Sequence, residues 1–463
     1  MTDGGQRRGF PRSLALLGAG AMFMEILDAT IVVTALPSIA ADLRISTVEA
    51  TSVVTAYLVT VAVLIPLSTW IAERFGTRRV CIAAMVLFTI ASAGCALAPN
   101  LAVLVVMRVA QAAGGAMMVP LGRLVVLSAI DIGHLARAIA YLTWPALVAP
   151  VLAPACGGLI VEYSGWRMIF VINIPLGIIG VIAALRIFPR DVPTQPRRLD
   201  VIGVLGAMTA IGAAMVAAES FAAAPIRWPV VLIGVAVAGI IGLATVRHMR
   251  RAPDPLLNLS VLQVRSFSSV IGYGSVYRLA ISAVPFALPL MLQVRFGWSP
   301  VAAGVMVGAL FAGNMVIKPV TTPLMRRCGI RWVIVGAAGV SAVAFALLAA
   351  VGPTTPMIGL AVLLVVSGMA RSVGFSAYNT LAFADVDESR LGDANAIHAA
   401  MQELGNAFGV ALASVGIALL DPVSKWLPAG AYSAVFVALV VVMALCVLGA
   451  LKLPARVGAH ALG

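Results

Sequence analysis

The chain has 463 residues, of which 62% are apolar and only 11% are charged. A soluble domain has roughly 45–50% apolar and about 25% charged residues, so the composition excludes a soluble globular protein and indicates an integral membrane protein. The formal net charge of +13 does not indicate nucleic-acid binding, because the basic residues are spread over the ends of apolar stretches rather than gathered in one patch.

Long apolar stretches follow one another along the chain, with lengths of about 18–26 residues that suit helices crossing ~30 Å of hydrocarbon. Strands of a membrane barrel would be about half as long and would alternate in polarity. We therefore predict an all-α membrane fold with fourteen spans, of which the seventh and eighth are the least distinct. The predicted spans are 13–38, 50–72, 79–98, 101–124, 137–161, 167–187, 199–219, 228–247, 267–294, 299–323, 331–350, 356–380, 397–420 and 428–452.

Basic residues mark one side of this predicted bundle. Most of the 31 Lys and Arg fall in loops that share a side if the N-terminus lies inside the cell. Cytoplasmic loops of membrane proteins carry such an excess, so we predict a multi-pass protein of the cytoplasmic membrane with both termini inside. The main clusters lie in 7–12, 74–79, 190–198, 247–251 and 326–331.

The spans are organised as six, two and six. The segments 188–200 and 247–255, which are charged and rich in proline, flank the central pair. A basic turn centred on a glycine follows the second span at 72–79 and recurs after the tenth at 324–331. Equivalent features at equivalent places indicate an internal repeat, the plan of many secondary transporters. We predict an N-terminal six-helix bundle over 1–188, two additional helices with cytoplasmic linkers over 189–262, and a C-terminal six-helix bundle over 263–463.

Two acids, Glu25 and Asp28, lie inside the first predicted span. An ionised carboxylate at the bilayer centre costs at least ~2.5 kcal/mol. A spacing of three residues places both acids on one face of a helix, and that face must look into a bundle or a watery cavity rather than into lipid. The pair therefore indicates a membrane protein that moves a solute.

Ordered motifs follow one another along the N-terminal half. The first span holds Leu27-Asp-Ala-Thr-Ile-Val-Val-Thr-Ala-Leu-Pro37, and the loop after the second holds Ile71-Ala-Glu-Arg-Phe-Gly-Thr-Arg-Arg79. Further along come Val106-Met-Arg-Val-Ala-Gln-Ala-Ala-Gly114, Ala153-Pro-Ala-Cys-Gly-Gly158 and Trp166-Arg-Met-Ile-Phe-Val-Ile-Asn-Ile-Pro-Leu-Gly177. In this order they resemble the signatures of the major facilitator superfamily, specifically its fourteen-helix drug:proton antiporter branch, and the resemblance covers essentially the whole chain.

Five positions depart from that branch's pattern. Val33 stands where the family often has Asn, and Ser52 stands where it commonly has Trp. Thr69 and Ala153 each replace a Gly, and Glu25 is additional to the first-span signature. These departures leave the expected fold unchanged and the substrate class open. The additional acid suggests that coupling uses two carboxyl groups rather than one.

Asp28 and Arg108 are expected at similar depths in the outer half of the membrane. At 1.5 Å per residue they lie roughly 14 Å and 10 Å from the outer ends of their spans. The resemblance implies that Arg108 sits beside Asp28 and modulates its protonation, so that Asp28 binds and releases a proton in each cycle. The alternative is a static buried ion pair. Glu25, one turn deeper, is a candidate for a cationic substrate or a second proton; the alternative is a protonated packing residue.

The C-terminal half carries charged residues of its own inside predicted spans. Arg371 and Glu403 both fall in the inner half of the membrane, so an ion pair with a structural or gating role is geometrically plausible, with a substrate role as the alternative. Arg278 lies nearer the midplane, where an unpaired charge is costly. It is expected either to pair with an acid or to meet an anionic group of the substrate. Lys318, near the inner end of the tenth span, is expected to snorkel.

The resemblance implies roles for two further motifs. Glu73, Arg74, Arg78 and Arg79 are implied to form a cytoplasmic latch, with Glu73 at the positive end of a helix in the other half; the alternative is that these basic residues only set the topology. The second motif marks antiporters in the resembled family, and alone it is a common kink of membrane helices. Its residues are Pro154, Gly157 and Gly158.

We therefore expect a proton-driven exporter of amphipathic small molecules, cations among them, that works by rocking of two six-helix halves. An exporter dedicated to an endogenous lipid, peptide or metabolite is the alternative. The four His are scattered and no loop gathers catalytic groups, which disfavours a membrane enzyme; a transport-dead sensor is the remaining alternative. No phosphate-binding loop or metal spacing is present, so we predict no cofactor and no metal. The expected partners are protons, the substrate and the lipid bilayer, with the chain as a monomer and without nucleic acid.

Overall fold

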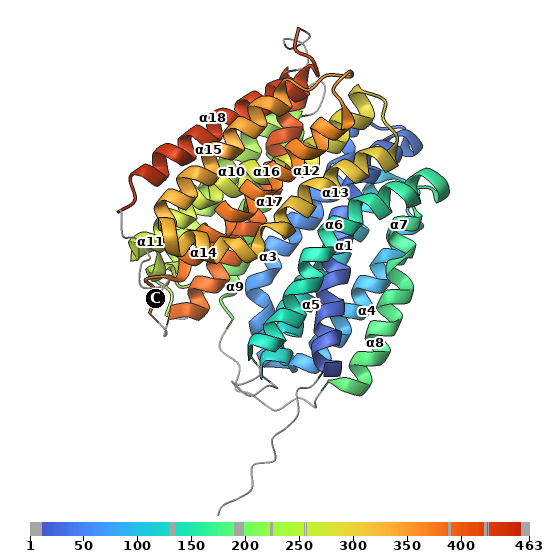
Figure 1. Cartoon of the computed structure of the whole chain (residues 1–463). Coiled ribbons are helices and arrows are strands. Elements are labelled where there is room, and N and C mark those ends of the chain that lie inside the picture. The colour runs from blue at the N-terminus through green and yellow to red at the C-terminus, as the bar shows by residue number, and fades with distance from the viewer. Residues whose placement is uncertain are drawn as a thin grey trace, which may run out of the picture.

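The computed structural model describes residues 12–128, 135–188, 199–222, 226–253, 255, 257–387, 390–420, 424 and 426–454. Over these residues the chain is helical (Figure 1). Thirteen of the described helices are long and apolar enough to cross a membrane, and a fourteenth crossing is made by a pair of helices that meet at a 50° bend. The predicted all-α plan with fourteen spans is therefore confirmed, with one of the spans broken into two helices.

The N-terminal bundle consists of the first eight helices. The first, α1, packs against α5 and α6, while α4 packs against α5 and α8. The path from α3 to α4 turns at Gly76, whose φ of 92° lies in the region that glycine adopts without steric cost. The bounds are α1 Arg12–Leu43, α2 Thr47–Ala50, α3 Ser52–Phe75, α4 Thr77–Ala96, α5 Leu101–Ser128, α6 Leu135–Ser164, α7 Met168–Val171 and α8 Asn173–Ile187.

Two additional helices, α9 (Val201–Ala222) and α10 (Trp228–Met249), follow this bundle and pack against each other. Helix α9 also contacts α3 of the N-terminal bundle and α17 (Leu391–Leu420) of the following one. Their cytoplasmic ends are joined by His248, whose Nε2 lies 2.7 Å from Oδ1 of Asp200. The least distinct pair of predicted spans is thus present, beside the junction of the two bundles.

The C-terminal bundle contains α11 to α18. Within it α12 packs against α17, and α15 packs against α16 and α18. The turn from α14 to α15 uses Gly329 at a φ of 78°, the counterpart of Gly76 and a second sign of the internal repeat. The bounds are α11 Arg265–Ser269, α12 Ser275–Leu290, α13 Pro300–Val316, α14 Lys318–Cys328, α15 Ile330–Ala349, α16 Met357–Phe383, α17 Leu391–Leu420 and α18 Ala431–Leu451, with a short 3-10 helix, η2, at Leu259–Gln263.

The first span of this bundle is an irregular helix. It begins with α11, widens to a π turn at Val270–Gly274, continues as α12 and widens again at Met291–Arg295. Pro285 and Pro289 lie just before the second π turn and lack the backbone N–H that regular α-helical bonding needs. The first π turn ends four residues before Arg278, and such turns occur frequently at functional sites.

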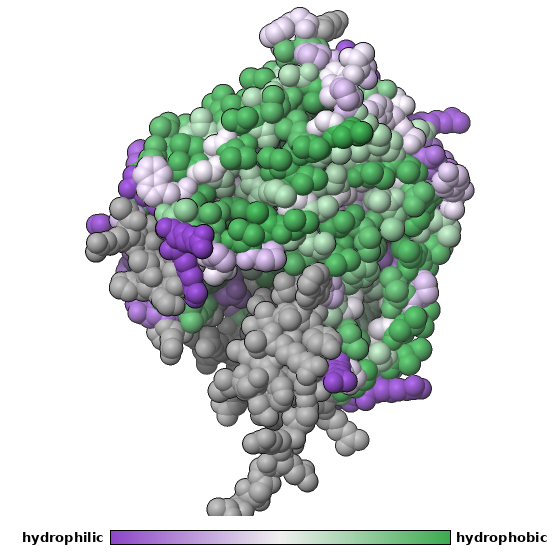
Figure 2. Space-filling model, in the orientation of Figure 1, coloured by the Kyte–Doolittle hydropathy of each residue, from purple (hydrophilic) through white to green (hydrophobic). Residues whose placement is uncertain are grey.

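The outside of the molecule matches a bilayer. Figure 2 shows apolar side chains over the middle of the visible face and polar ones gathered toward its two ends. Many large apolar side chains are more than a third exposed, including Ile182 on α8 at 46% and Leu243 on α10 at 73%. Lipid would cover such side chains, because a soluble monomer rarely exposes wide apolar patches.

The two bundles are joined at their outer ends. Hydrogen bonds between them link Gln293 to the carbonyl of Thr34 at 3.1 Å and the backbone N–H of Val301 to Glu162 at 3.3 Å. Buried apolar residues of the outer N-terminal bundle, from Leu27 to Ala40 among others, are continuous with the core of the C-terminal bundle. Those of the inner N-terminal bundle form a separate cluster, and the two groups of helices diverge toward the end where α1 begins (Figure 1). The molecule is therefore closed on its outer side.

Candidate functional site

Asp28 of α1 and Arg108 of α5 form a fully buried ion pair. Nη1 of Arg108 lies 2.5 Å from Oδ2 of Asp28, and the two side chains are 1% and 0% exposed. The prediction that equal depth brings these two residues together is confirmed. A charged pair in such a place is stable only when its remaining polar atoms are also bonded.

Neighbouring polar groups supply those bonds. The other carboxylate oxygen of Asp28 accepts hydrogen bonds from Asn173 at 2.7 Å and from Gln111 at 2.9 Å. Gln111 also accepts from Arg108 at 2.6 Å and donates to Ser92 at 2.7 Å. Four helices, α1, α4, α5 and α8, therefore converge on one carboxylate that has donors on both oxygens.

The guanidinium of Arg108 is held from its other sides as well. Its Nε donates to the backbone carbonyl of Val53 at 3.2 Å, and its Cζ lies 4.2 Å from the ring centre of Tyr57. The Tyr57 hydroxyl in turn donates to Glu25 at 3.3 Å. Tyr57 thus connects the buried pair to the second acid of α1.

Glu25 differs from Asp28 in its surroundings. It is partly exposed, whereas Asp28 is fully buried. Its carboxyl group lies within electrostatic range of Glu403 of α17, which belongs to the opposite bundle. Glu25 and Glu403 therefore belong to opposite bundles and lie within electrostatic range of each other.

Glu403 and Arg278 provide the charged groups of the C-terminal bundle that face this junction. Asn406 donates to Glu403 at 3.1 Å, and Ser282 of α12 holds Asn406 with a bond of 2.6 Å. Arg278 of α12 lies within electrostatic range of Glu403, yet no ion pair joins them among the described residues, and Nε of Arg278 has no hydrogen-bond partner there. Its Cζ lies 4.4 Å from the ring centre of Phe375.

The predicted ion pair between Arg371 and Glu403 is not formed in the described part of the chain. Arg371 of α16 lies over the ring of Phe311 with Cζ 4.9 Å from its centre, and its Nη1 has no hydrogen-bond partner. The pair was predicted from depth along the helices, and depth does not fix the direction in which a side chain points. Helix α16 packs on α13 and α15, so Arg371 contacts α13 rather than Glu403 on α17.

The prediction that Lys318 snorkels from the inner end of its span is wrong. Lys318 is the first residue of α14, at the 50° bend after α13, and α14 continues to Cys328. The ammonium group is therefore well above the inner end, where it donates to Ser376 of α16 at 2.9 Å. A span longer than predicted, and broken at this residue, is the reason for the error.

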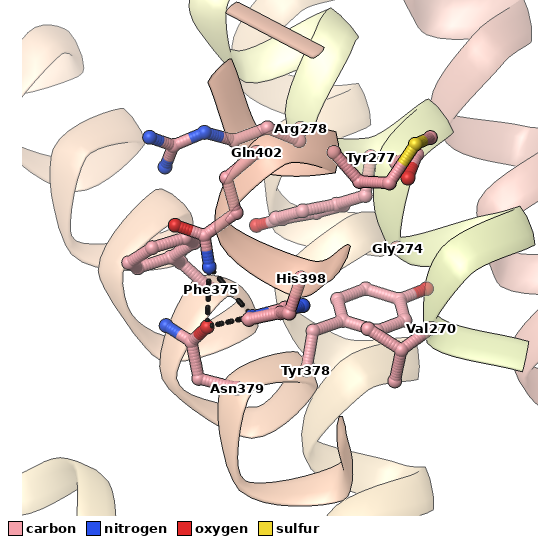
Figure 3. A pocket seen from close by; sticks show the side chains of 11 residues that line it. Val270, Gly274, Tyr277, Arg278, Phe375, Tyr378, Asn379, His398 and Gln402 are labelled. Atoms are coloured by element: carbon pink, nitrogen blue, oxygen red, sulfur yellow. Dashed lines mark hydrogen bonds between the residues drawn. The ribbon is translucent and has the colours of Figure 1, made fainter. Parts of the chain in front are cut away.

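A cavity of about 20 Å³ lies beside Arg278 between α12, α16 and α17 (Figure 3). A polar cluster from α16 and α17 lines it: His398 and Gln402 both bond to Oδ1 of Asn379, at 2.6 Å and 2.7 Å. Such a volume holds about one water molecule. The cavity lined by Phe375 and these polar groups can therefore hold a small polar group, but it is too small for a larger ligand.

The motif of the fifth span lies where the two bundles meet. Gly158 of α6 faces the backbone of Pro300, and Gly304 of α13 faces the carbonyl of Pro154. A Cβ atom at Gly158 would lie 2.8 Å from Cα of Val301. The prediction that these glycines permit close helix packing is confirmed, and the packing is part of the outer closure. Gly157 contributes on the neighbouring side, against Ile31 of α1.

The latch residues lie at the cytoplasmic end of the N-terminal bundle. Arg74 and Arg79 are exposed, and Arg78 donates to the backbone carbonyl of Leu185 at 2.5 Å. Leu185 belongs to the last turn of α8, whose free carbonyls attract a cation. This hydrogen bond of Arg78 therefore stays within its own bundle. The side chain of Glu73 lies outside the part of the chain that the structure describes.

Sequence reasoning missed several residues of the site. Gln111 and Asn173 were inside quoted motifs, and both are polar side chains within apolar spans, which is the signal that could have identified them. Tyr57 gave no such signal, since an aromatic residue in a span is ordinary packing. Among the described residues no group of His, Cys, Asp and Glu could hold a metal ion.

Comparison with known proteins identifies the family. The sequence profile of the Major Facilitator Superfamily matches residues 18–245 and 270–461. The chain is 34% identical over 420 residues to a protein of Escherichia coli O81 (strain ED1a) named "Putative multidrug resistance protein MdtD", covering 89% of this chain and 88% of that protein. A protein of Pectobacterium atrosepticum with the same name is 34% identical over 428 residues, covering 91% of each.

Solved structures show the same fold at low sequence identity. The POT family transporter PepTSo superimposes with a TM-score of 0.69 at 14% identity, over 96% of this chain and 100% of that one. A D-xylose-proton symporter superimposes with a TM-score of 0.66 at 18% identity, over 97% and 99%. The chain belongs to the Major Facilitator Superfamily and is a multi-pass transporter of the cell membrane rather than an enzyme.

Proposed function

We propose that this protein is a proton-coupled exporter of amphipathic small molecules that works by alternating access. The observation that carries the proposal is the placement of Glu25 one turn below the buried Asp28–Arg108 pair, facing the junction between the bundles. Ionisable groups inside a membrane mark solute pathways and proton relays. The names of the relatives from Escherichia and Pectobacterium, both multidrug resistance proteins, support export of drugs or toxic compounds.

The two acids of α1 would share the proton-coupling step. Protonation of Asp28 removes the negative charge that balances Arg108, and a buried cation cannot remain uncompensated at low cost. Glu25 also lies within electrostatic range of Arg108, so it can supply a replacement charge as it loses its own proton. A proton entering at one acid and leaving from the other would thus be coupled to movement of α1 against α5.

The outer closure indicates from which side solutes reach the acids in this conformation. With the outer ends of the bundles packed together, solutes would reach Glu25 and Glu403 from the cytoplasm. Rocking that opens the outer side must separate the backbones at Gly158 and Gly304, which carry no side chain to interlock. Substrate would leave on that side while protons enter, because the proton gradient of the cell membrane runs inward.

The test is efflux of a lipophilic cation dye from whole cells or inverted vesicles, with and without a protonophore. We expect wild-type efflux to collapse with the protonophore and in the Asp28→Asn variant, when efflux is normalised to the amount of folded protein in the membrane. Full, protonophore-sensitive efflux by Asp28→Asn would contradict the assignment of Asp28.

An exporter dedicated to an endogenous lipid, peptide or metabolite is the second candidate. One observation favours it: the C-terminal bundle places Arg278 and Arg371 inside the membrane with unbonded nitrogen atoms, which suits an anionic cargo. Absence of efflux for several cationic dyes, with efflux of an anionic compound, would favour this candidate.

A further inference from the structure

The charges buried at mid-depth are unequal in the two bundles. In the N-terminal bundle the buried Arg108 is balanced by Asp28. Inside the predicted spans of the C-terminal bundle lie Arg278, Lys318 and Arg371, and the acid Glu403 lies within electrostatic range of Arg278. One carboxylate cannot neutralise three cations, so this side of the junction carries an excess of positive charge.

The two arginines also affect each other electrostatically. Arg278 and Arg371 lie within electrostatic range, where their like charges repel. Nε of Arg278 and Nη1 of Arg371 are buried atoms without hydrogen-bond partners among the described residues. A pair of like charges in a membrane, with donors left unbonded, lowers stability. A role in binding an anion would explain why the sequence retains them.

Aromatic rings orient both guanidinium groups. Arg278 lies over Phe375 at 4.4 Å and Arg371 lies over Phe311 at 4.9 Å. A guanidinium that rests on a ring with its flat face keeps its N–H edge available, and that edge matches the two oxygens of a carboxylate. Figure 3 shows the Arg278 side chain extending from α12 past Gln402 and Phe375.

Glu403 does not saturate this site. It is bonded to Asn406 at 3.1 Å and also lies within electrostatic range of Glu25 of the other bundle. Lys318 adds to the positive side, since its ammonium group lies 6.0 Å from the ring of Phe375 that also supports Arg278. Charge and aromatic surface therefore occur together, the combination that an amphipathic anion needs.

We propose that Arg278 and Arg371 form a binding site for the carboxylate of an amphipathic substrate, whose apolar body packs against Phe311 and Phe375. The proposal rests on the proposed export function and gives it a substrate class: organic anions with an apolar or aromatic body. Anions would then bind at these arginines of the C-terminal bundle, while Glu25 of the N-terminal bundle remains available to a cation or a proton.

The test measures binding directly, so that it does not depend on transport. The purified full-length protein, in nanodiscs of zwitterionic lipid, is titrated with 11-(dansylamino)undecanoic acid and with the matching primary amide. We expect the carboxylate to bind at least ~10-fold more tightly than the amide, because charge-assisted hydrogen bonds contribute about 1.5–3 kcal/mol. In Arg278→Gln and Arg371→Gln this preference should fall to near equality, through weaker carboxylate binding alone.

Two further variants serve as controls. Arg186→Gln removes an exposed arginine of α8 and should leave the preference unchanged. Arg278→Lys keeps the charge without the planar fork, and should retain part of the preference even if the glutamine variant does not fold. Equal binding of carboxylate and amide by the wild type would overturn the proposal, as would an Arg278→Gln protein that folds and keeps the full preference.

Two outcomes separate this inference from the export function. An arginine-dependent carboxylate preference without protonophore-sensitive efflux would support the anion site and contradict proton-coupled export. Protonophore-sensitive efflux of cations without any carboxylate preference would do the reverse. Repeating the titration with phosphatidylglycerol in the nanodisc identifies the anion's source: loss of dansyl-probe binding in the wild type, but not in Arg278→Gln, would mean that a lipid headgroup occupies the same arginines.

Discussion

The two bundles treat their buried charges in opposite ways. In the N-terminal bundle, Asp28 and Arg108 contact each other, and Gln111 and Asn173 complete their hydrogen bonds. In the C-terminal bundle, Arg278 and Arg371 rest on aromatic rings and leave nitrogen atoms unbonded. The two bundles share a repeat plan, marked by the turns at Gly76 and Gly329, yet their charged residues inside the spans are arranged differently.

Hydrogen bonding distinguishes an internal partner from an external one. A charge whose donors and acceptors are all satisfied within the protein exchanges protons or holds helices together. A charged group whose donors have no hydrogen-bond partner in the protein lowers stability unless a ligand supplies the missing hydrogen bonds. On this comparison the N-terminal bundle is suited to coupling and the C-terminal bundle to substrate, and stability measurements can test the division.

The largest effect is expected at Asp28. Asp28→Asn leaves Arg108 as a buried cation without its counter-charge, and breaking such a pair costs about 3–5 kcal/mol. We expect a clear fall in the thermal unfolding midpoint of the purified protein, with enough folded protein left for assay at low temperature. The double variant Asp28→Asn/Arg108→Gln should recover part of the midpoint but none of the coupling. If the double variant is no more stable than Asp28→Asn, then loss of the Asp28–Arg108 ion pair does not explain the lower unfolding midpoint.

The opposite sign is expected at Arg371. Arg371→Met removes a charge that has no acid partner in the described structure while keeping the length of the side chain. Replacing an uncompensated buried charge by an apolar group relieves its desolvation cost. The unfolding midpoint should stay level or rise, by an amount equivalent to about 1 kcal/mol or more. A fall in the midpoint as large as that of Asp28→Asn would show that Arg371 has a structural partner, and would contradict the proposed difference between the two bundles.

The sequence predicted the fold well because membrane insertion leaves few alternatives. Span length, basic loops and turns centred on Gly76 and Gly329 are local properties, and each follows from hydrocarbon thickness or backbone sterics. The break at Lys318 was missed because a bend inside an apolar span changes neither length nor composition. Its cause, Pro319 at the start of α14, is visible only as one proline among many.

The site was predictable only in part, for a geometric reason. Depth along a span follows from counting residues, and it correctly brought Asp28 and Arg108 together. Rotation about the helix axis depends on which neighbours a helix packs against, and no residue count supplies that. For this reason Arg371 was assigned to Glu403 when it contacts Phe311.

A double-mutant cycle tests which arginine interacts with Glu403. We expect Arg278→Gln and Glu403→Gln to be non-additive in unfolding free energy by about 1 kcal/mol, because these groups lie within electrostatic range. The cycle of Arg371→Gln with Glu403→Gln should be closer to additive. Charge reversal at both Arg371 and Glu403 should likewise fail to restore function. Rescue of function by that double reversal would indicate that Arg371 and Glu403 do form the ion pair expected from depth alone.

The smallest effect is expected for an ion pair that resembles Asp28–Arg108 in distance but not in burial. Nη1 of Arg167 lies 2.5 Å from Oδ2 of Asp42, yet the two side chains are 42% and 46% exposed. Solvent screens such pairs, which contribute about 0–1 kcal/mol. Asp42→Asn should therefore lower the unfolding midpoint only slightly, and added salt should shrink the difference further. A loss comparable to that of Asp28→Asn would mean that ion-pair distance, rather than burial, sets the energetic difference between these sites.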